Sequence, residues 1–121
     1  MRRYLVAGNW KLNMGPKDGR QLAADLQDLL AGRELKGDVL VCPPFVSIPA
    51  VGEVATGDPV QLGAQNCASE AGGAYTGEVS AQMLAEAGVR YVIVAHSERR
   101  EYQKETDDLF VKKINLIHEA G

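Results

Sequence analysis

Residues 91–100 decide how this chain folds, and they read YVIVAHSERR. The apolar run over residues 91–95 has the length of a strand, and its abrupt polar end favours a strand buried on both faces, as in a parallel sheet. Ser97 follows where a helix N-cap would lie, so the sequence places His96 between the carboxyl end of a strand and the start of a helix. Ligands bind at that edge of α/β sheets. We therefore expect His96 in a functional site.

The rest of the chain alternates between strands and helices. The pattern predicts strands over residues 4–11, 38–42, 60–66 and 91–95. It predicts helices over residues 21–31, 48–55, 79–87 and 107–120, and the first of these can open at Pro16. Such alternation indicates an α/β fold with a parallel sheet and right-handed crossovers. We expect one domain over residues 1–121, built from four βα modules.

Composition excludes several classes of protein. The chain has 121 residues, is 45% hydrophobic and 24% charged, and carries a net charge of −3, which argues against a nucleic-acid or anionic-membrane surface. The apolar run over residues 4–7 is too short for a signal peptide, and no segment approaches the length of a membrane span. We expect a soluble cytoplasmic protein.

Neither the cysteines nor the sequence motifs indicate a cofactor. Cys42 and Cys67 are far apart and lack a CxxC or paired-histidine spacing, so we interpret them as core residues in a reducing compartment. No metal-ligand set, phosphate-binding glycine motif or nucleophile elbow is present in the sequence. The sequence therefore predicts no metal and no cofactor.

Two further segments have functional features. The period of two along residues 4–11 places Asn9 and Lys11 on one face, so both side chains emerge together at the carboxyl end of the first strand. The loop over residues 67–77 contains three glycines in eleven residues and is long for a βα connection. Long loops of this kind often carry function.

Four segments resemble the triosephosphate isomerase family, in the same order. They are GNWKLN at residues 8–13, GAQN at 63–66, GAYTGE at 73–78 and VAHSERR at 94–100. Each lies at the end of a predicted strand or in the loop after it. The resemblance covers essentially all 121 residues. It implies the first four βα units of a (β/α)8 barrel of about 250 residues, a (βα)4 half barrel with its helices outside.

The resemblance also implies roles for individual residues. The family interconverts dihydroxyacetone phosphate and glyceraldehyde 3-phosphate through an enediolate. His96 matches its electrophile, a neutral imidazole that donates to the substrate carbonyl, and Lys11 matches the residue that meets phosphate and developing charge. Asn9 matches a substrate-binding amide. Glu98 matches a supporting or proton-shuttling carboxylate, and a carboxylate in the first turn of a helix, stabilised by the helix dipole, is its alternative.

The glycine-rich loop resembles the subunit-interface loop of the family. There, Thr76 would reach into the partner's site and order Asn9 and Lys11; a flexible surface loop is the alternative. The expected interface residues are Met14, Gly73, Tyr75, Thr76, Gly77 and Glu78. Arg99, Arg100 and Glu105 are expected to form a charged network that braces the loop.

The chain ends before a fifth strand. The family's catalytic glutamate, closing lid and phosphate loops lie in the other half, so we expect negligible turnover alone and activity only with a C-terminal half barrel. A self-associating folding module without catalysis is the main alternative, and a small-ligand site of Asn9, Lys11 and His96 is a weaker one. The expected partners are a C-terminal half-barrel chain, or a second copy bound through exposed strand edges, and triose phosphate as the substrate of the completed enzyme.

Overall fold

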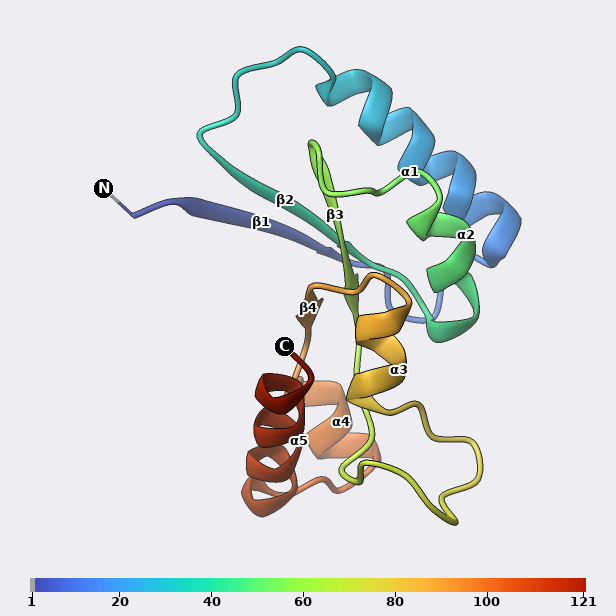
Figure 1. The fold of residues 1–121 in the computed structure, drawn as a ribbon, viewed down its shortest axis with the longest axis vertical. Helices are drawn as coiled ribbons and strands as arrows, with labels where there is room; N and C mark the ends of the chain where they lie inside the picture. The colour runs from blue at the N-terminus through green and yellow to red at the C-terminus, as the bar shows by residue number, and fades with distance from the viewer. Residues whose placement is uncertain (1) are drawn as a thin grey trace.

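The computed structural model describes residues 2–121, and four parallel strands form its sheet. The strands follow the order of the sequence: β1 (Tyr4–Asn9), β2 (Gly37–Cys42), β3 (Val60–Ala64) and β4 (Tyr91–Val92). Figure 1 shows β1 at the outer edge of this sheet, where the chain begins. The register pairs Val6 with Val39 and Gly63 with Tyr91, so the carboxyl ends of all four strands meet at one edge.

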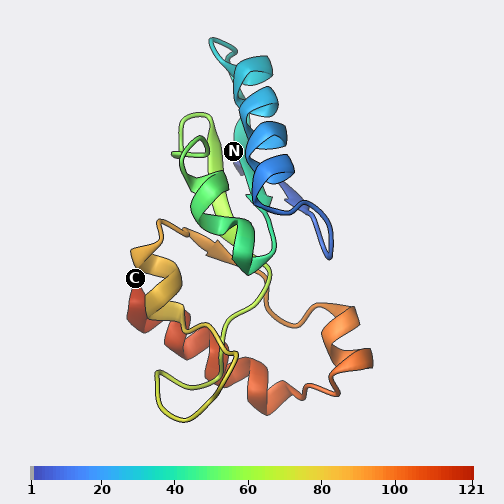
Figure 2. The same ribbon diagram turned by 90° about the vertical axis from the view of Figure 1, so that its right-hand side faces the viewer.

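Helices connect these strands in the order expected for βα modules. They are α1 (Pro16–Leu30), the short 3₁₀ helix η1 (Phe45–Ser47), α2 (Ile48–Gly52), α3 (Ala81–Glu86), α4 (Ser97–Tyr102) and α5 (Asp107–Ala120). Figure 2 shows α1 and α2 beside the first part of the sheet and α3 beside α5, and these two helix pairs are in contact. None of the helices within residues 2–121 is long and apolar enough to cross a membrane.

The boundaries follow local chemistry. Pro16 opens α1, as its fixed backbone angle and missing N–H allow, and Gly32, at a φ of 72°, follows the end of that helix. The prediction of a helix over residues 107–120 is confirmed as α5, and the strand predicted over 38–42 begins only one residue earlier. The middle helices are shorter than predicted. In α3, Ser80 is the N-cap, and its side chain accepts a hydrogen bond from the Met83 amide.

Two predictions about residues 91–100 are wrong. The fourth strand spans only Tyr91–Val92, is half-buried, and pairs with β3 alone among the described residues. Ile93 still donates to the Ala64 carbonyl, but Ala95 leaves the extended conformation at a φ of 63°. The N-cap of α4 is His96 rather than Ser97, because the imidazole accepts from the Glu98 amide and Ser97 is already helical.

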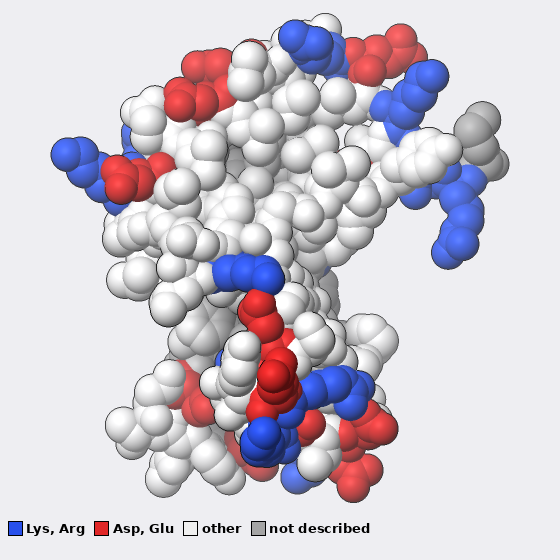
Figure 3. Space-filling model, turned by 180° about the vertical axis from the view of Figure 1, so that it is seen from behind, with Lys and Arg blue, Asp and Glu red and all other residues white. Residues whose placement is uncertain are grey.

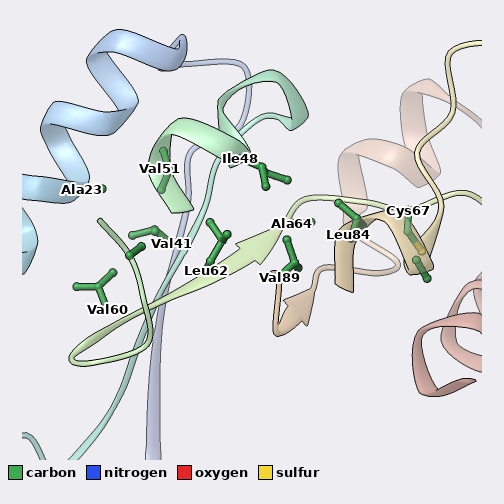
Figure 4. Close-up of a cluster of buried hydrophobic side chains, with 12 residues drawn as sticks. Ala23, Val41, Ile48, Val51, Val60, Leu62, Ala64, Cys67, Leu84 and Val89 are labelled. Carbon is green, nitrogen blue, oxygen red and sulfur yellow. The ribbon is translucent and has the colours of Figure 1, made fainter. Parts of the chain in front are cut away.

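The hydrophobic core lies between the sheet and the helices. Figure 4 shows Val41 and Leu62 from neighbouring strands together with Val51 from α2. All three side chains are at most 2% exposed. Burying a side chain of this size contributes about 1.5–3 kcal/mol, so this cluster fixes the strands against α1 and α2. Leu84 and Val89 extend the same cluster toward α5.

The edge strand β1 is the main exception to this burial. Tyr4, Leu5 and Val6 are 67%, 51% and 65% exposed, although their residue types favour a covered strand. β1 pairs with β2 on one side, and no described residue pairs with its other side. The sheet therefore presents an apolar edge with free backbone donors and acceptors.

Candidate active site

An open cavity of about 700 Å³ lies at the carboxyl edge of the sheet. It is lined by residues that end a strand or follow one, among them Asn9, Lys11, Gln65, Asn66, His96 and Glu98. Parallel strands bring the loops after their carboxyl ends to one place, so residues distant in sequence share this cavity.

Lys11 reaches across the cavity from the end of β1 to the start of α4. Its Nζ lies 2.7 Å from Glu98 Oε1, and both side chains are about half-exposed. The hydrogen bond from this ammonium is the main reason that the pKa of Glu98 lies below its usual value. A carboxylate held in this way stays ionised at neutral pH and is a weaker base.

His96 is held by the first turn of α4. Its Nδ1 accepts from the Glu98 backbone amide at 3.1 Å. Nδ1 therefore carries a lone pair, which leaves the proton of the neutral ring on Nε2. Glu98 Oε2 lies 3.7 Å from the same Nδ1. The ring is thus oriented by α4, with a hydrogen-bond donor on its far side.

These contacts join Asn9, Lys11, Glu98 and His96 into one cluster. The Asn9 side chain accepts from the Lys11 amide at 3.0 Å, Lys11 binds Glu98, and Glu98 contacts His96. An ammonium, an imidazole N–H and an amide at one rim form a set of donors for an oxygen that gains negative charge. The structure brings these four predicted residues together.

The family model for triosephosphate isomerase matches residues 4–121. The chain belongs to the triosephosphate isomerase family. It is 47% identical over 119 residues to a triosephosphate isomerase of Clostridium botulinum (strain Loch Maree / Type A3), covering 98% of this chain and 47% of the relative. It is 44% identical over 121 residues to one of Bacteroides fragilis (strain YCH46), covering 100% and 48%.

A solved structure gives the same result. The crystal structure of triosephosphate isomerase from Bartonella henselae superposes with a TM-score of 0.85 at 35% identity, covering 99% of this chain and 49% of that one. The chain therefore spans about half the length of the relatives it matches. It corresponds to the N-terminal half of a triosephosphate isomerase, and its four parallel strands and their helices form a (βα)4 half barrel.

The loop that resembles the family's subunit-interface loop lies away from the cavity. Residues 73–78 are all exposed, and none of them lines it. Figures 1 and 2 show the yellow-green loop before α3 extending away from the sheet. Within it, the Tyr75 amide donates to the Gly73 carbonyl and the Glu78 amide to the Tyr75 carbonyl, both at 3.0 Å. Thr76 and Gly77 lie in this turn, and the structure does not bring them to Asn9 or Lys11 of the same chain.

Met14 lies in the loop between β1 and α1. Its φ is 68°, its side chain is 38% exposed, and its carbonyl accepts from the Ser47 hydroxyl at 2.7 Å. This contact fixes the loop after Lys11 against η1. Met14 does not line the cavity within this chain.

A charged network reaches the cavity through Arg99 and Asn66, and it is larger than the sequence predicted. Arg99 donates to Glu105 at 2.7 Å, and Arg100 binds Asp107 at 2.8 Å. Lys113 of α5, only 4% exposed, joins the network through Glu105 and through Asn66, 2.7 Å away. The sequence feature that could have indicated a buried Lys113 is its place on the apolar face of a predicted helix, three residues after Phe110.

Glu105 is ionised inside this network. Its burial acts to raise its pKa, but the hydrogen bonds from Lys113 and Arg99 outweigh that effect, so the pKa of this carboxyl lies below its usual value. The network ties the segment after β3 to α5 and to α4, the helix whose N-cap is His96.

Within residues 2–121, no group of three histidine, cysteine, aspartate or glutamate side chains is arranged to hold a metal ion. Cys42 and Cys67 are buried and unbridged, and burial raises the pKa of the Cys42 thiol to about 11. This thiol is therefore protonated at neutral pH and is a poor nucleophile.

Proposed function

We propose that this chain supplies the electrophilic wall of a triosephosphate isomerase active site, and that a C-terminal half barrel supplies the rest. The observation that carries this proposal is the contact of Lys11 with Glu98 beside an oriented His96. In the completed enzyme the substrates are dihydroxyacetone phosphate and glyceraldehyde 3-phosphate.

Each residue then has a defined task. The Nε2–H of His96 donates to the substrate carbonyl and stabilises the negative charge of the enediolate. The Lys11 ammonium attracts the substrate phosphate, and Asn9 donates an amide hydrogen bond. Glu98 orients Lys11 and supports proton transfer. Its lowered pKa makes it a poor substitute for the missing base.

The chain alone is expected to have negligible turnover. Loss of a general base lowers a rate by about 10² to 10⁴, and the loops that would hold the phosphate are also outside this half. Glycolysis and gluconeogenesis in the cytoplasm are the setting we propose for the completed enzyme, and the two free thiols of the chain suit a reducing compartment.

The exposed surfaces support the need for a partner. Tyr4, Leu5 and Val6 leave the β1 edge open to another strand. Leu12, which lines the cavity, is 95% exposed, and Met14 in the same loop is 38% exposed. We propose that the C-terminal half covers the β1 edge, and that the loop over residues 73–78 binds at the cavity mouth of a second subunit.

Complementation tests this function. The chain is mixed with a polypeptide that spans the last four strands of a family member, and isomerase activity is measured in the purified complex. His96→Ala is expected to lower kcat about 10²- to 10³-fold, as for loss of one donor to a developing oxyanion. His118→Ala is the matched control, because His118 is the other histidine, exposed near the end of α5. A stoichiometric complex without activity contradicts the proposal.

Self-association without catalysis is a second candidate. The observation that favours it is the same open β1 edge, which a second copy can pair with. Sedimentation of the purified chain separates the two functions. A stable, inactive homo-oligomer that fails to exchange with the C-terminal half supports self-association and contradicts complementation.

A further inference from the structure

The GAQN segment at residues 63–66 contains one residue without an assigned role. Gly63 has no room for a side chain, since an added Cβ would lie 2.6 Å from Cys42 Sγ. Ala64 is fully buried in the core, and Asn66 accepts from the buried Lys113. Gln65 belongs neither to the core nor to that network, and its side chain lies against the cavity.

The Gln65 amide connects the ends of three neighbouring strands. Its Nε2 donates to the Lys11 carbonyl at 2.8 Å and to the Cys42 carbonyl, also at 2.8 Å. One amide nitrogen has two hydrogens, and both are used here. Lys11 follows β1, Cys42 ends β2 and Gln65 follows β3, so this single side chain fixes three strand ends relative to one another.

The Lys11 backbone needs such support. Its φ is 53°, in the left-handed region that residues with a Cβ disfavour. The peptide group before Lys11 is held by the Asn9 side chain, which accepts from the Lys11 amide at 3.0 Å. The peptide group after it is held by Gln65. Both sides of this strained residue are therefore anchored by side chains.

This backbone conformation directs the Lys11 side chain. From it, Nζ reaches Glu98 at 2.7 Å, although the two residues are 87 positions apart in sequence. An extended conformation at Lys11 would point the side chain elsewhere, because rotation about φ swings the side chain relative to the preceding strand.

We propose that Gln65 is a positioning residue, which holds Lys11 in its left-handed conformation and thereby keeps the ammonium beside Glu98 and His96. The part of Lys11 in the reaction rests on the proposed function. The anchoring of its backbone by Gln65 does not, and it can be measured without substrate or partner.

Lysine-specific labelling tests the anchoring in the 121-residue chain. Each lysine is trace-acetylated with acetic anhydride and quantified by peptide mass spectrometry, and the rate at Lys11 is divided by the rate at the exposed Lys17 of α1. Gln65→Met keeps the length of the side chain and removes both hydrogen bonds. Loss of two such bonds is expected to raise the Lys11 to Lys17 ratio about tenfold.

Gln82→Met is the matched control, since the Gln82 side-chain amide donates at 3.4 Å to Glu86 on the same helix and takes no part in the bonds that hold Lys11. It is expected to leave the ratio unchanged. Gln65→Asn is a second variant, because its amide is one carbon too short to reach both carbonyls. A folded Gln65 variant with an unchanged ratio overturns the proposal, whereas a uniform rise at every lysine reports unfolding.

If both Gln65 variants unfold, hydrogen exchange of side-chain amides in the unsubstituted chain tests whether Gln65 makes the two hydrogen bonds. The side-chain NH₂ protons of Gln65 are expected to exchange with water at least about tenfold more slowly than those of the exposed Gln82, because each of the two Gln65 protons is hydrogen-bonded to a backbone carbonyl. Equal exchange overturns the proposal. In the active complex, Gln65→Met is expected to lower kcat/KM about tenfold. If the complex of the unsubstituted chain is inactive but Gln65→Met still raises the labelling ratio, the proposed function is contradicted and the role of Gln65 is supported.

Discussion

At the scale of single residues, backbone strain is concentrated around the cavity. Within residues 2–121, four non-glycine residues have a positive φ: Lys11, Met14, Ala95 and Lys104. The first three lie in the segments that leave β1 and β4. The side chains of Asn9 and Gln65 anchor Lys11, and the Ser47 hydroxyl anchors Met14. Strained residues persist where surrounding contacts determine them, and such positions cluster at functional sites.

Lys104 has the same conformation just after α4, where the Glu105 amide donates to the Arg99 carbonyl at 3.4 Å, and this allows a prediction. It lies in the exposed turn between α4 and α5 at a φ of 57°. Lys104→Gly is expected to raise the free energy of unfolding by about 1 kcal/mol, because glycine adopts this φ without steric cost. Lys112→Gly, in the exposed part of α5, is the control and is expected to lower it by about 1 kcal/mol. Urea denaturation measures both, and destabilisation by Lys104→Gly contradicts the argument.

At the scale of the elements, close contacts set how the strands and helices meet. β2 and β3 approach through Gly63, which faces Cys42 and Leu40. α5 docks through a buried ion pair as well as through Phe110, over whose ring the Arg100 guanidinium lies at 4.5 Å. Breaking a buried pair by removing one partner is costly, since the remaining charge is left without compensation.

The contact at Gly63 predicts a destabilising substitution. A Cβ at this position would lie 2.6 Å from Cys42 Sγ and 3.0 Å from Leu40 Cδ1. Gly63→Ala is therefore expected to lower the free energy of unfolding by about 1–3 kcal/mol. Gly72→Ala, where a Cβ meets nothing within 4 Å, is the control. Thermal unfolding of both variants checks this, and equal midpoints contradict it.

The buried Glu105 predicts how stability depends on pH. Its pKa in the folded chain lies below the ordinary value of 4.5, because Lys113 and Arg99 outweigh the effect of burial. The contribution of ionised Glu105 to the free energy of unfolding is therefore fully present above pH 4.5, and it is lost as the pH falls through the lower pKa of the folded state. Glu105→Gln is expected to weaken the dependence of the free energy of unfolding on pH in this acidic range. Glu119→Gln, at an exposed site on α5, is expected to leave that dependence unchanged. Urea unfolding at several pH values below 4.5 measures the slopes.

At the scale of the whole molecule, the chain is a parallel half barrel with an uncovered edge. On the face drawn in Figure 3, lysine and arginine side chains lie interspersed with aspartate and glutamate. That mixture agrees with the net charge of −3 and gives no single-signed surface on this face. The apolar β1 edge is thus a stronger candidate for association than any charged patch in this view.

Hydrogen exchange tests which partner covers that edge. Amides of Tyr4, Leu5 and Val6 are expected to exchange at least about tenfold faster than those of β2 in the dilute chain, because an unpaired edge opens more easily. Addition of the C-terminal half is expected to protect them. Protection that instead rises with the concentration of the chain alone supports self-association. Unchanged exchange in both cases contradicts a role for this edge.

The sequence by itself determined the alternation of strands and helices, the place of Asn9 and Lys11 at the end of the first strand, and the place of His96 between the last strand and the helix after it. These features depend on residue periodicity and on a few neighbouring residues, so they are visible locally. Only the tertiary structure decided that His96 caps α4, that β4 is short, that Lys113 binds Asn66, and that Gln65 anchors Lys11. Lys113 and Asn66 are 47 positions apart, and Gln65 and Lys11 are 54 apart. Hydrogen bonds over such separations form only once the sheet has brought its strand ends together, and they leave no periodic pattern in the chain.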